Sequence, residues 1–304
     1  METMINNTEV SNTEVSDSWI EADAHSFAEN FNRRSFALNH HHSSHPLFQL
    51  PELLEMAKRT AATRPYHLYY DAGDIRIDQR WDQVPRKTFS VQDALHRIET
   101  AGAWIILKHA QRDPKYRILI EQGMAELKSL IGDDIDAQIK QEDLIIFITS
   151  PRRVSSYHID RECNFLLQIR GAKTIHIFDQ NDREVLPEHE LERFWTVDNN
   201  AAQYKPHLQS RATSYLLQPG TGVHLPVNAP HWVENADNVS ISLSVNFQFK
   251  DSVRANVYRA NYLLRKLGMK PTPHGQAPLR DAIKNQVVGT AMYVRQMFRG
   301  ESPW

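Results

Sequence analysis

The stretch SSYHIDRECNFLLQIRGAKTIHIF, residues 155–178, has a histidine and an aspartate two positions apart at the head of a strand-like run. Residues two apart in a β-strand project to the same face of the sheet. His158 and Asp160 are therefore able to present an imidazole nitrogen and a carboxylate oxygen to one metal ion. The rest of a metal site has to come from elsewhere in the chain.

The stretch GTGVHLPVNAPHWVENAD offers two candidates for a third ligand, His224 and His231. His231 follows Pro230 and leads into a predicted strand, after a turn in which Pro226 and Pro230 confine the backbone. His231 is the favoured ligand for this reason. His224 lies inside the preceding predicted strand, where a pocket-lining or hydrogen-bonded structural role is the default and metal ligation is the alternative.

Two histidines and one carboxylate on one face of an octahedron form a site typical of non-haem Fe(II), because three adjacent positions stay open for a chelating co-substrate and O2. Neutral imidazoles and one carboxylate leave a ferrous site with a net charge of about +1, which attracts an anionic chelator. The single cysteine, Cys163, excludes an internal disulfide and a cysteine-built zinc site.

A 2-oxoacid chelator with a second carboxylate needs a fixed cation deeper in the site. Lys173 stands just past Gly171 at the start of the next predicted strand; the alternative is a solvated lysine at a sheet edge. The stretch SISLSVNFQF alternates polar and apolar residues, so its polar face lines either a cavity or solvent. If it lines a cavity, Asn246 is placed to meet the chelated group.

This order of residues resembles the JmjC or cupin-like 2-oxoglutarate oxygenases, particularly the asparaginyl-hydroxylase type. The resemblance covers about residues 143–250 and rests on the intervals from the HxD histidine to an Asn and a Lys, and from the distal His to the Asn of SVNF. It implies a jelly-roll fold and assigns His158, Asp160 and His231 to iron, Lys173 and Ser155 to 2-oxoglutarate, and Asn164 and Asn246 to supporting contacts.

The chain departs from that type at the co-substrate site. The type carries Thr where this chain has Ser155, which keeps the hydroxyl but not the methyl group. A tyrosine that contacts the co-substrate in some members has no clear counterpart, and AGAWIILKHA offers Trp104 and Lys108 in that region. Co-substrate binding is therefore expected to differ in detail.

The resemblance implies an Fe(II)- and 2-oxoglutarate-dependent dioxygenase that uses O2 to hydroxylate an unidentified substrate. A peptide or protein side chain is the expected substrate, by analogy only. One alternative is a small-molecule hydroxylase acting on a natural product or metabolite. Another is a metal-binding cupin without oxygenase activity, such as an isomerase or sensor, although that site needs no dicarboxylate clamp. A third alternative is a pure interaction module.

The pattern of elements predicts a mainly β fold with flanking helices, a double-stranded β-helix core and a C-terminal helical extension. NTEVS occurs twice within residues 7–16 and has too little apolar surface to fold alone. Short strands are predicted at 143–149, 164–170, 173–178, 213–218, 222–226, 231–234 and 239–249. The predicted parts are a disordered arm (1–20), a mixed α/β part packing on the core (21–142), the jelly-roll core (143–250) and C-terminal helices (251–304).

The C-terminal segment is basic and amphipathic. Residues 250–304 contain ten Lys or Arg and three Asp or Glu, a net charge of +7 in a chain whose net charge is −2. Its apolar positions favour helix docking or a homodimer over nucleic acid or an anionic membrane. They form two stripes: Val253, Val257, Ala260, Leu264 and Leu267, then Ile283, Val287, Ala291, Val294 and Phe298.

The remaining features carry weaker predictions. No apolar run reaches the ~18 residues of a membrane span, and the first residues do not resemble a signal peptide, so a cytoplasmic protein is expected. The histidines between His40 and His45 are expected to serve surface or packing roles rather than to bind metal. Arg152 and Arg153 are expected either to recognise an anionic or peptide substrate or to lie in a solvated loop.

Overall fold

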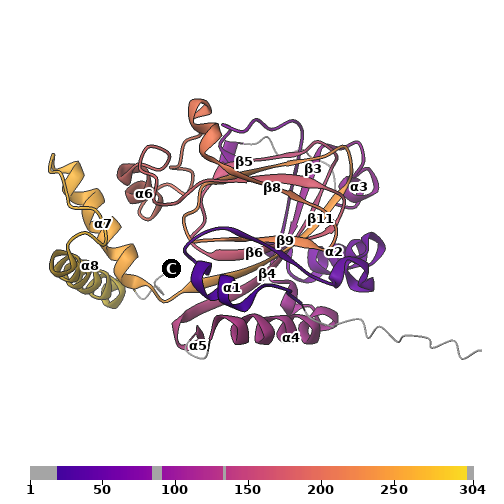
Figure 1. Ribbon diagram of the computed structural model, residues 1–304, viewed down its shortest axis with the longest axis horizontal. Helices are drawn as coiled ribbons and strands as arrows, with labels where there is room; N and C mark the ends of the chain where they lie inside the picture. The colour runs from indigo at the N-terminus through magenta and orange to yellow at the C-terminus, as the bar shows by residue number, and fades with distance from the viewer. Residues whose placement is uncertain (1–18, 84–90, 133–134, 300–304) are drawn as a thin grey trace, which may run out of the picture.

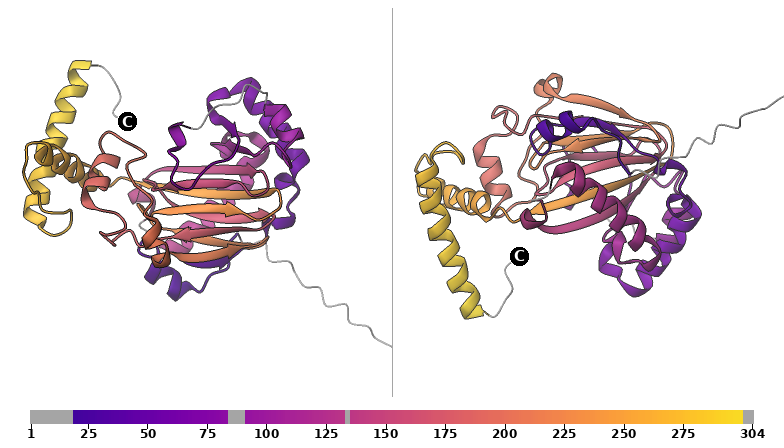
Figure 2. Two further views of the ribbon diagram at one scale, coloured as in Figure 1. Left: turned by 90° about the horizontal axis from the view of Figure 1, so that it is seen from above. Right: turned by 60° about the horizontal axis from the view of Figure 1, so that its bottom comes forward.

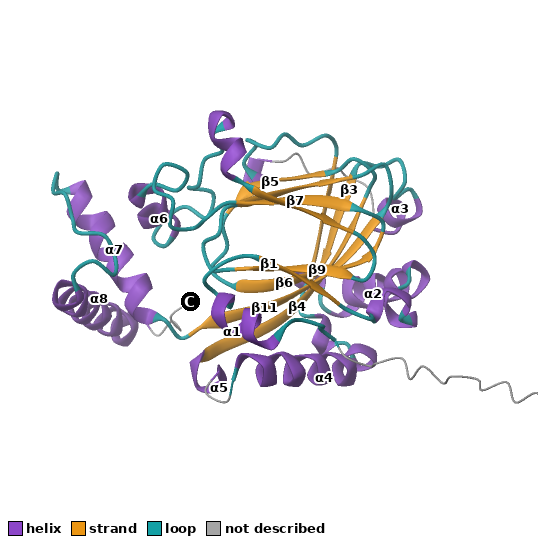
Figure 3. Ribbon diagram, in the orientation of Figure 1, coloured by secondary structure: helices purple, strands orange, loops and turns teal. Residues whose placement is uncertain are grey.

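The computed structural model describes residues 19–83, 91–132 and 135–299. Its strands form two antiparallel sheets, a larger one in the order β1-β9-β6-β11-β4-β3-β2 and a smaller one in the order β5-β10-β7-β8 (Figures 1 and 3). The strands of the larger sheet are β1 (Phe36–Asn39), β2 (Leu68–Ala72), β3 (Ala103–Leu107), β4 (Ile139–Thr149), β6 (Cys163–Arg170), β9 (Thr221–Leu225) and β11 (Ser240–Phe249). The strands of the smaller sheet are β5 (Val154–His158), β7 (Lys173–Ile177), β8 (Thr213–Leu217) and β10 (His231–Asn235).

Helices cover the outer side of the larger sheet and one end of the molecule (Figure 1). The described helices are α1 (Ala24–Asn30), α2 (Leu50–Thr63), α3 (Val91–His96), α4 (Pro114–Ile131), α5 (Ile135–Gln138), α6 (Glu188–Phe194), α7 (Ser252–Lys266) and α8 (Pro278–Arg299). None of these helices is long and apolar enough to cross a membrane. The predicted mainly β jelly-roll class with flanking and C-terminal helices is confirmed.

The alternation along β11 decides which side of the larger sheet is apolar. Ile241, Leu243, Val245 and Phe247 are buried in the main hydrophobic core with residues of α1, α2 and α4. The alternate residues therefore face the smaller sheet, because successive side chains of a strand point to opposite faces. β6 to β11 begin and end within one residue of their predicted ranges, while β4 begins four residues earlier than predicted.

Trp19 and Ile20, which were predicted to belong to a disordered arm, are docked on the protein. Residues 1–18, including the NTEVS repeat, lie outside the described residues. Trp19 and Ile20 are 2% and 4% exposed, and the Glu126 carboxylate accepts hydrogen bonds from both backbone N–H groups. A Cβ at Gly123 would overlap the Trp19 ring, so this glycine makes room for the anchor. Extending the disordered arm to residue 20 was wrong because one tryptophan buries enough apolar surface to dock the backbone.

The two C-terminal helices differ in how they use their predicted apolar stripes. In α7, Val257 and Ala260 are buried and Val253 is 42% exposed, whereas Leu267, which follows the last residue of the helix, is 73% exposed. The Arg265 guanidinium donates two hydrogen bonds to the buried Glu192 carboxylate and ties α7 to α6. α8 packs against α7 and projects away from the sheets (Figure 2).

The histidines between His40 and His45 serve packing and surface roles, as predicted. His40 and His42 are buried; His40 Nε2 lies 2.9 Å from the Gln168 carbonyl oxygen, and His42 packs against the Trp19 ring. His41 lies near the surface, 2.7 Å from Glu21. Within the described part of the chain, these histidines do not form a candidate metal cluster.

Both predictions for Arg153 were wrong, because its guanidinium is buried in the protein interior. It pairs with Asp71, and the two side chains are 3% and 1% exposed. It also donates hydrogen bonds to the carbonyl oxygens of Gly73 and Gly102 and so joins β5 to the β2–β3 region. Arg152 is 78% exposed and lies near Asp237, which matches the solvated-loop alternative for that residue.

We expect Arg153→Ala to lower the free energy of unfolding by about 3 kcal/mol, because it leaves the Asp71 carboxylate buried without its counter-charge. Arg152→Ala is the matched control, and its expected change is within about 0.5 kcal/mol. Chemical denaturation followed by circular dichroism measures both values. Equal, small effects of the two substitutions would contradict the structural role of Arg153.

Candidate metal and co-substrate site

Three potential metal ligands meet where β5 ends and β10 begins. His158 and His231 are direct partners in the antiparallel pairing of these strands, and their ring centroids lie 4.2 Å apart. Asp160 Oδ2 lies 3.8 Å from His158 Nε2 and 3.6 Å from His231 Nε2. The potential ligand atoms of these three residues lie within 4.8 Å of one another, close enough to bind one metal ion. No other such group of His, Cys, Asp or Glu side chains occurs among the described residues.

Asp160 reaches this position through a turn and not through strand geometry. β5 ends at His158, so the expectation that both residues project from one strand face was wrong for Asp160. The Asn228 backbone N–H donates a hydrogen bond to the Asp160 carbonyl oxygen at 3.0 Å. Asn228 itself has a left-handed conformation with φ 63°, and its side chain accepts a hydrogen bond from Trp195 Nε1. A long-range contact therefore holds the aspartate beside the histidines.

Both histidine rings are oriented for metal binding through Nε2. His158 Nδ1 lies 2.7 Å from the Ser156 carbonyl oxygen, and His231 Nδ1 lies 2.9 Å from the Ala229 carbonyl oxygen. A carbonyl only accepts, so each Nδ1 carries a proton, and in the neutral imidazole Nε2 is then the nitrogen with the lone pair. Burial, together with the nearby His158, lowers the pKa of His231 to about 4, so this imidazole is neutral at physiological pH. The donor set fits a divalent metal ion.

A cavity of about 560 Å³ lies between the two sheets and contains every predicted site residue on its wall. This volume is in the range of small-molecule sites. The wall residues named from the sequence are Ser155, His158, Asp160, Asn164, Lys173, His231 and Asn246.

Lys173 is a buried cation on this wall. The preceding turn contains Gly171 at φ 70°, where a Cβ would overlap the Val239 carbonyl oxygen, so the turn requires glycine. Lys173 is 5% exposed, and no carboxylate of the described residues forms an ion pair with it. Burial lowers its pKa to about 7. The alternative of a solvated edge lysine was wrong, and the ammonium group lacks the anion that would compensate its desolvation.

Asn164 and Asn246 lie side by side on β6 and β11. The Asn246 amide donates a 3.0 Å hydrogen bond to the Ser244 carbonyl oxygen and accepts one from the Ser244 hydroxyl. The Asn164 Oδ1 atom is buried and has no hydrogen-bond partner among the described residues. Because buried polar atoms are almost always paired, this oxygen is a candidate contact for a bound group.

His224 has the hydrogen-bonded structural role that the sequence favoured over metal ligation. Its Nδ1 lies 3.0 Å from the Asn164 carbonyl oxygen, and its Nε2 accepts a hydrogen bond from the Asn32 backbone N–H at 2.9 Å. Its ring packs against Phe31 and Phe165 on the outer side of the larger sheet. Both ring nitrogens are used, so His224 has no free nitrogen for a metal ion. Cys163 is fully buried, and burial raises the pKa of its thiol, as expected for an inert cysteine.

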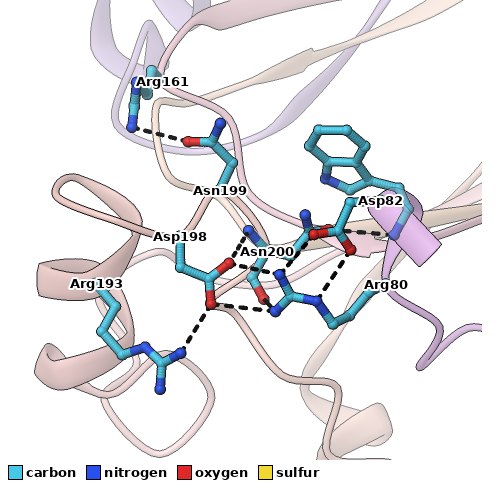
Figure 4. Close-up of polar contacts among 8 residues, drawn as sticks. Arg80, Asp82, Arg161, Arg193, Asp198, Asn199 and Asn200 are labelled. Carbon is cyan, nitrogen blue, oxygen red and sulfur yellow. Dashed lines mark hydrogen bonds and ion pairs between the residues drawn. The ribbon is translucent and has the colours of Figure 1, made fainter.

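The mouth of the cavity contains residues that the sequence did not reveal. Figure 4 shows the Arg80 guanidinium between the carboxylates of Asp82 and Asp198, with Arg193 on the far side of Asp198. The hydrogen bonds from Arg80 lower the pKa of Asp198 to about 2. This cluster joins the segment that contains Trp81 to the loop after α6, and Trp81 lines the cavity.

Arg161 connects the same loop to the metal-ligand turn. Its guanidinium donates a hydrogen bond to the Phe194 carbonyl oxygen and another to the Asn199 side chain. Figure 4 shows the contact with Asn199. Trp81, Arg161, Phe194 and Asn199 all lie on the cavity wall. These residues belong to segments without hydrophobic periodicity, so no sequence signal pointed to them.

The chain matches a known domain family and several solved structures. Residues 49–253 match the cupin-like domain family. Escherichia coli YcfD has a TM-score of 0.54 at 16% sequence identity, and the alignment covers 91% of this chain and 69% of YcfD. YcfD described as a ribosomal oxygenase, in complex with cobalt and 2-oxoglutarate, has a TM-score of 0.50 at 16% identity and coverages of 90% and 67%. The cobalt and succinic acid complex has a TM-score of 0.50 at 17% identity with the same coverages.

At these identities the likeness shows a shared fold. A search of curated proteins gave no significant match.

Proposed function

This chain belongs to the cupin-like domain family, and on that premise we propose that it is an Fe(II)- and 2-oxoglutarate-dependent dioxygenase that hydroxylates its substrate. One observation carries the proposal: a His-Asp-His group shares a cavity with Lys173, a buried amine that forms no ion pair within the described residues. A simple metal-binding cupin has no need of that lysine, whereas a dicarboxylate that chelates the metal ion would pair with it.

The site residues have distinct proposed roles. His158, Asp160 and His231 would hold the iron, and Lys173 and Ser155 would hold the distal carboxylate of 2-oxoglutarate. Asn164 and Asn246 would contact the chelated end. With O2, the bound iron and 2-oxoglutarate supply the oxidant for C–H hydroxylation, with succinate and CO2 as the other products. The chain's share is to fix the ligand geometry, orient the co-substrate and aim the substrate at the metal.

The proposed substrate is a peptide or protein side chain. The support is that YcfD is described as a ribosomal oxygenase, although the likeness to it is one of fold. The cavity also has room for a natural product or metabolite, so small-molecule hydroxylation is the alternative of the same mechanism. A non-oxygenase cupin, an isomerase or a sensor, is the alternative without 2-oxoglutarate. The single cysteine suits a reducing compartment such as the cytoplasm, which is the proposed location.

Anaerobic titration with Fe(II) and 2-oxoglutarate tests the proposed function. A weak visible charge-transfer band should appear, and its absence at saturating ligand would remove the oxygenase interpretation. Aerobic turnover against fractionated cell extract then identifies the substrate. The expected readouts are succinate release and a product with a mass gain of one oxygen, both absent with His158→Ala.

We also propose that α8 forms a homodimer interface. The face of α8 toward α7 makes polar contacts: Asn285 accepts a hydrogen bond from Asn256, and Asp281 is buried. The apolar side chains face outward instead, with Leu279, Ile283 and Val287 84%, 65% and 62% exposed. An exposed apolar stripe of this kind marks an interaction surface, and a second copy of the same helix is the proposed partner.

The double substitution Ile283→Asp, Val287→Asp is expected to convert the dimer to a monomer, because it places two charges in the apolar contact. Sedimentation equilibrium measures the mass of the wild type and the variant. Lys270→Asp, on an exposed residue outside the α8 stripe, is a charge-change control and should leave the dimer intact. A monomeric wild type would refute the interface.

A further inference from the structure

The end of the cavity away from the metal ligands is closed by a contact between the sheets. Thr149, the last residue of β4, lines the cavity. The Asn235 side-chain amide donates a 2.7 Å hydrogen bond to Thr149 Oγ1 and another of 2.7 Å to the Ser150 carbonyl oxygen. Asn235 belongs to the smaller sheet and Thr149 to the larger one. The pair fixes the position of the Thr149 hydroxyl.

This hydroxyl lies at the same end as Lys173. Asn235 is the direct partner of Lys173 in the antiparallel pairing of β10 and β7. Ser155, on β5, pairs with Val233 of the neighbouring strand β10. Lys173, Ser155 and Thr149 therefore contribute one ammonium group and two hydroxyls to one region of the cavity wall.

The proton of the Thr149 hydroxyl makes only a long hydrogen bond in this structure. Its oxygen accepts the hydrogen bond from Asn235, and its own donation is a long 3.4 Å contact to the Ser240 carbonyl oxygen. Hydrogen bonds to ionised acceptors are shorter and stronger than bonds to neutral carbonyls. A carboxylate beside Lys173 would therefore attract this proton.

A third hydroxyl on the cavity wall, that of Tyr69, already has a hydrogen-bond acceptor. Tyr69 lines the cavity, but its hydroxyl donates a 3.3 Å hydrogen bond to Asp71, which the buried Arg153 holds. The Tyr69 ring meets the Trp104 ring edge-on at 5.9 Å. Trp104 in turn pairs with Thr149 across β3 and β4. The printed contact of the Tyr69 hydroxyl is thus the one with Asp71, on the side of the Arg153 ion pair.

We propose that Thr149 is a further co-substrate-binding residue that donates a hydrogen bond to the distal carboxylate of 2-oxoglutarate, and that Asn235 is its positioning residue. The proposal rests on the proposed function and deepens it. It gives the chain a second hydroxyl contact, besides Ser155, for a carboxylate that also pairs with Lys173. It also explains why a bond between the sheets holds a cavity-lining threonine.

Calorimetric titration of the Co(II)-loaded protein tests the proposal without turnover. The probes are 2-oxoglutarate and pyruvate, a 2-oxoacid that chelates a metal ion but has no distal carboxylate. Thr149→Val should raise the Kd for 2-oxoglutarate about tenfold, the size of one hydrogen bond to a charged group, and leave the Kd for pyruvate unchanged. Thr149→Ser keeps the hydroxyl, so its Kd for 2-oxoglutarate should stay within about threefold of the wild-type value. Tyr69→Phe should change neither the Kd for 2-oxoglutarate nor that for pyruvate.

Asn235→Ala should also raise the Kd for 2-oxoglutarate, and the double variant with Thr149→Val should bind no worse than Thr149→Val alone, because the two residues act through one hydroxyl. Additive losses would refute the positioning role.

Two results would overturn the assignment of Thr149. One is unchanged 2-oxoglutarate binding by Thr149→Val, and the other is an equal loss of pyruvate binding, which indicates structural damage. A wild type that binds pyruvate but not 2-oxoglutarate refutes the proposed function itself, and the assignment of Thr149 with it.

Discussion

Replacing either His158 or His231 with alanine is expected to reduce 2-oxoglutarate turnover by roughly 1000-fold or more, because the proposed chemistry takes place on the metal ion that these side chains hold. Their Nε2 atoms, both within 3.8 Å of Asp160, are the donors that face the remaining ligand. Metal analysis after gel filtration is a second readout, and the bound metal should fall from one per chain to a small fraction.

His189→Ala is the matched control, because His189 is exposed and lies outside the cavity wall. It should leave turnover and metal content unchanged. Circular dichroism separates loss of the site from loss of the fold. If His231→Ala keeps full metal content and turnover, the assignment of the metal site is wrong.

Lys173→Met is expected to raise the Kd for 2-oxoglutarate about 100-fold, since a buried charge pair is lost and the distal carboxylate is left without its cation. The same substitution should stabilise the protein below pH 7. The folded-state pKa of Lys173, about 7, is below its unfolded value, so the folded state disfavours the charged lysine, and methionine removes this cost. A variant that is more heat-stable yet binds 2-oxoglutarate poorly would exclude unfolding as the cause.

The same lysine predicts the pH dependence of co-substrate binding. Below pH 7 Lys173 is protonated and ready to pair with the carboxylate; above pH 7 it is increasingly neutral, so binding has to take up a proton. The Kd for 2-oxoglutarate should therefore rise with pH, approaching tenfold per pH unit above pH 7.

Calorimetry of the Co(II)-loaded protein between pH 6.5 and 8.5 measures this slope. Lys173→Arg keeps the charge over the whole range and should bind without that slope, even if more weakly. Glu162 also lines the cavity, and burial raises its pKa to about 7. It is present in both the wild type and the Lys173→Arg variant, so its titration would contribute equally to both. An equal slope in both would assign the titration to a group other than Lys173.

Much of the fold and of the candidate site follows from local patterns in the sequence. The alternation SISLSVNFQF predicted both the strand and its apolar packing side, because a strand has two faces and only one of them packs against the helices. Whether the polar side faced a cavity or solvent was left open. Short strand-like runs separated by turns predicted the ranges of most core strands. Lys173 was predicted at the start of its strand because Gly171 marks the turn before it, and the spacing of His158, Asp160 and His231 pointed to one metal site.

Tertiary contacts decided what the local patterns could not. Asp160 stands beyond the end of its strand, and the Asn228 backbone, 68 positions away, holds it beside the histidines. Arg153 was expected to recognise a substrate or to lie in a solvated loop, yet Asp71, 82 positions earlier, holds it in the interior. The Arg80–Asp198 cluster at the mouth joins segments 118 positions apart that have no periodicity.

The apolar stripes of the C-terminal helices show the same limit. Periodicity revealed the stripes, but only the packing of α8 on α7 shows that the α8 stripe faces outward. The sequence alone determined which residue types lie on which face of each element, because that depends on backbone period. Which faces meet, and which polar groups are left unpaired between them, depends on contacts between distant segments, and only the tertiary structure decided those.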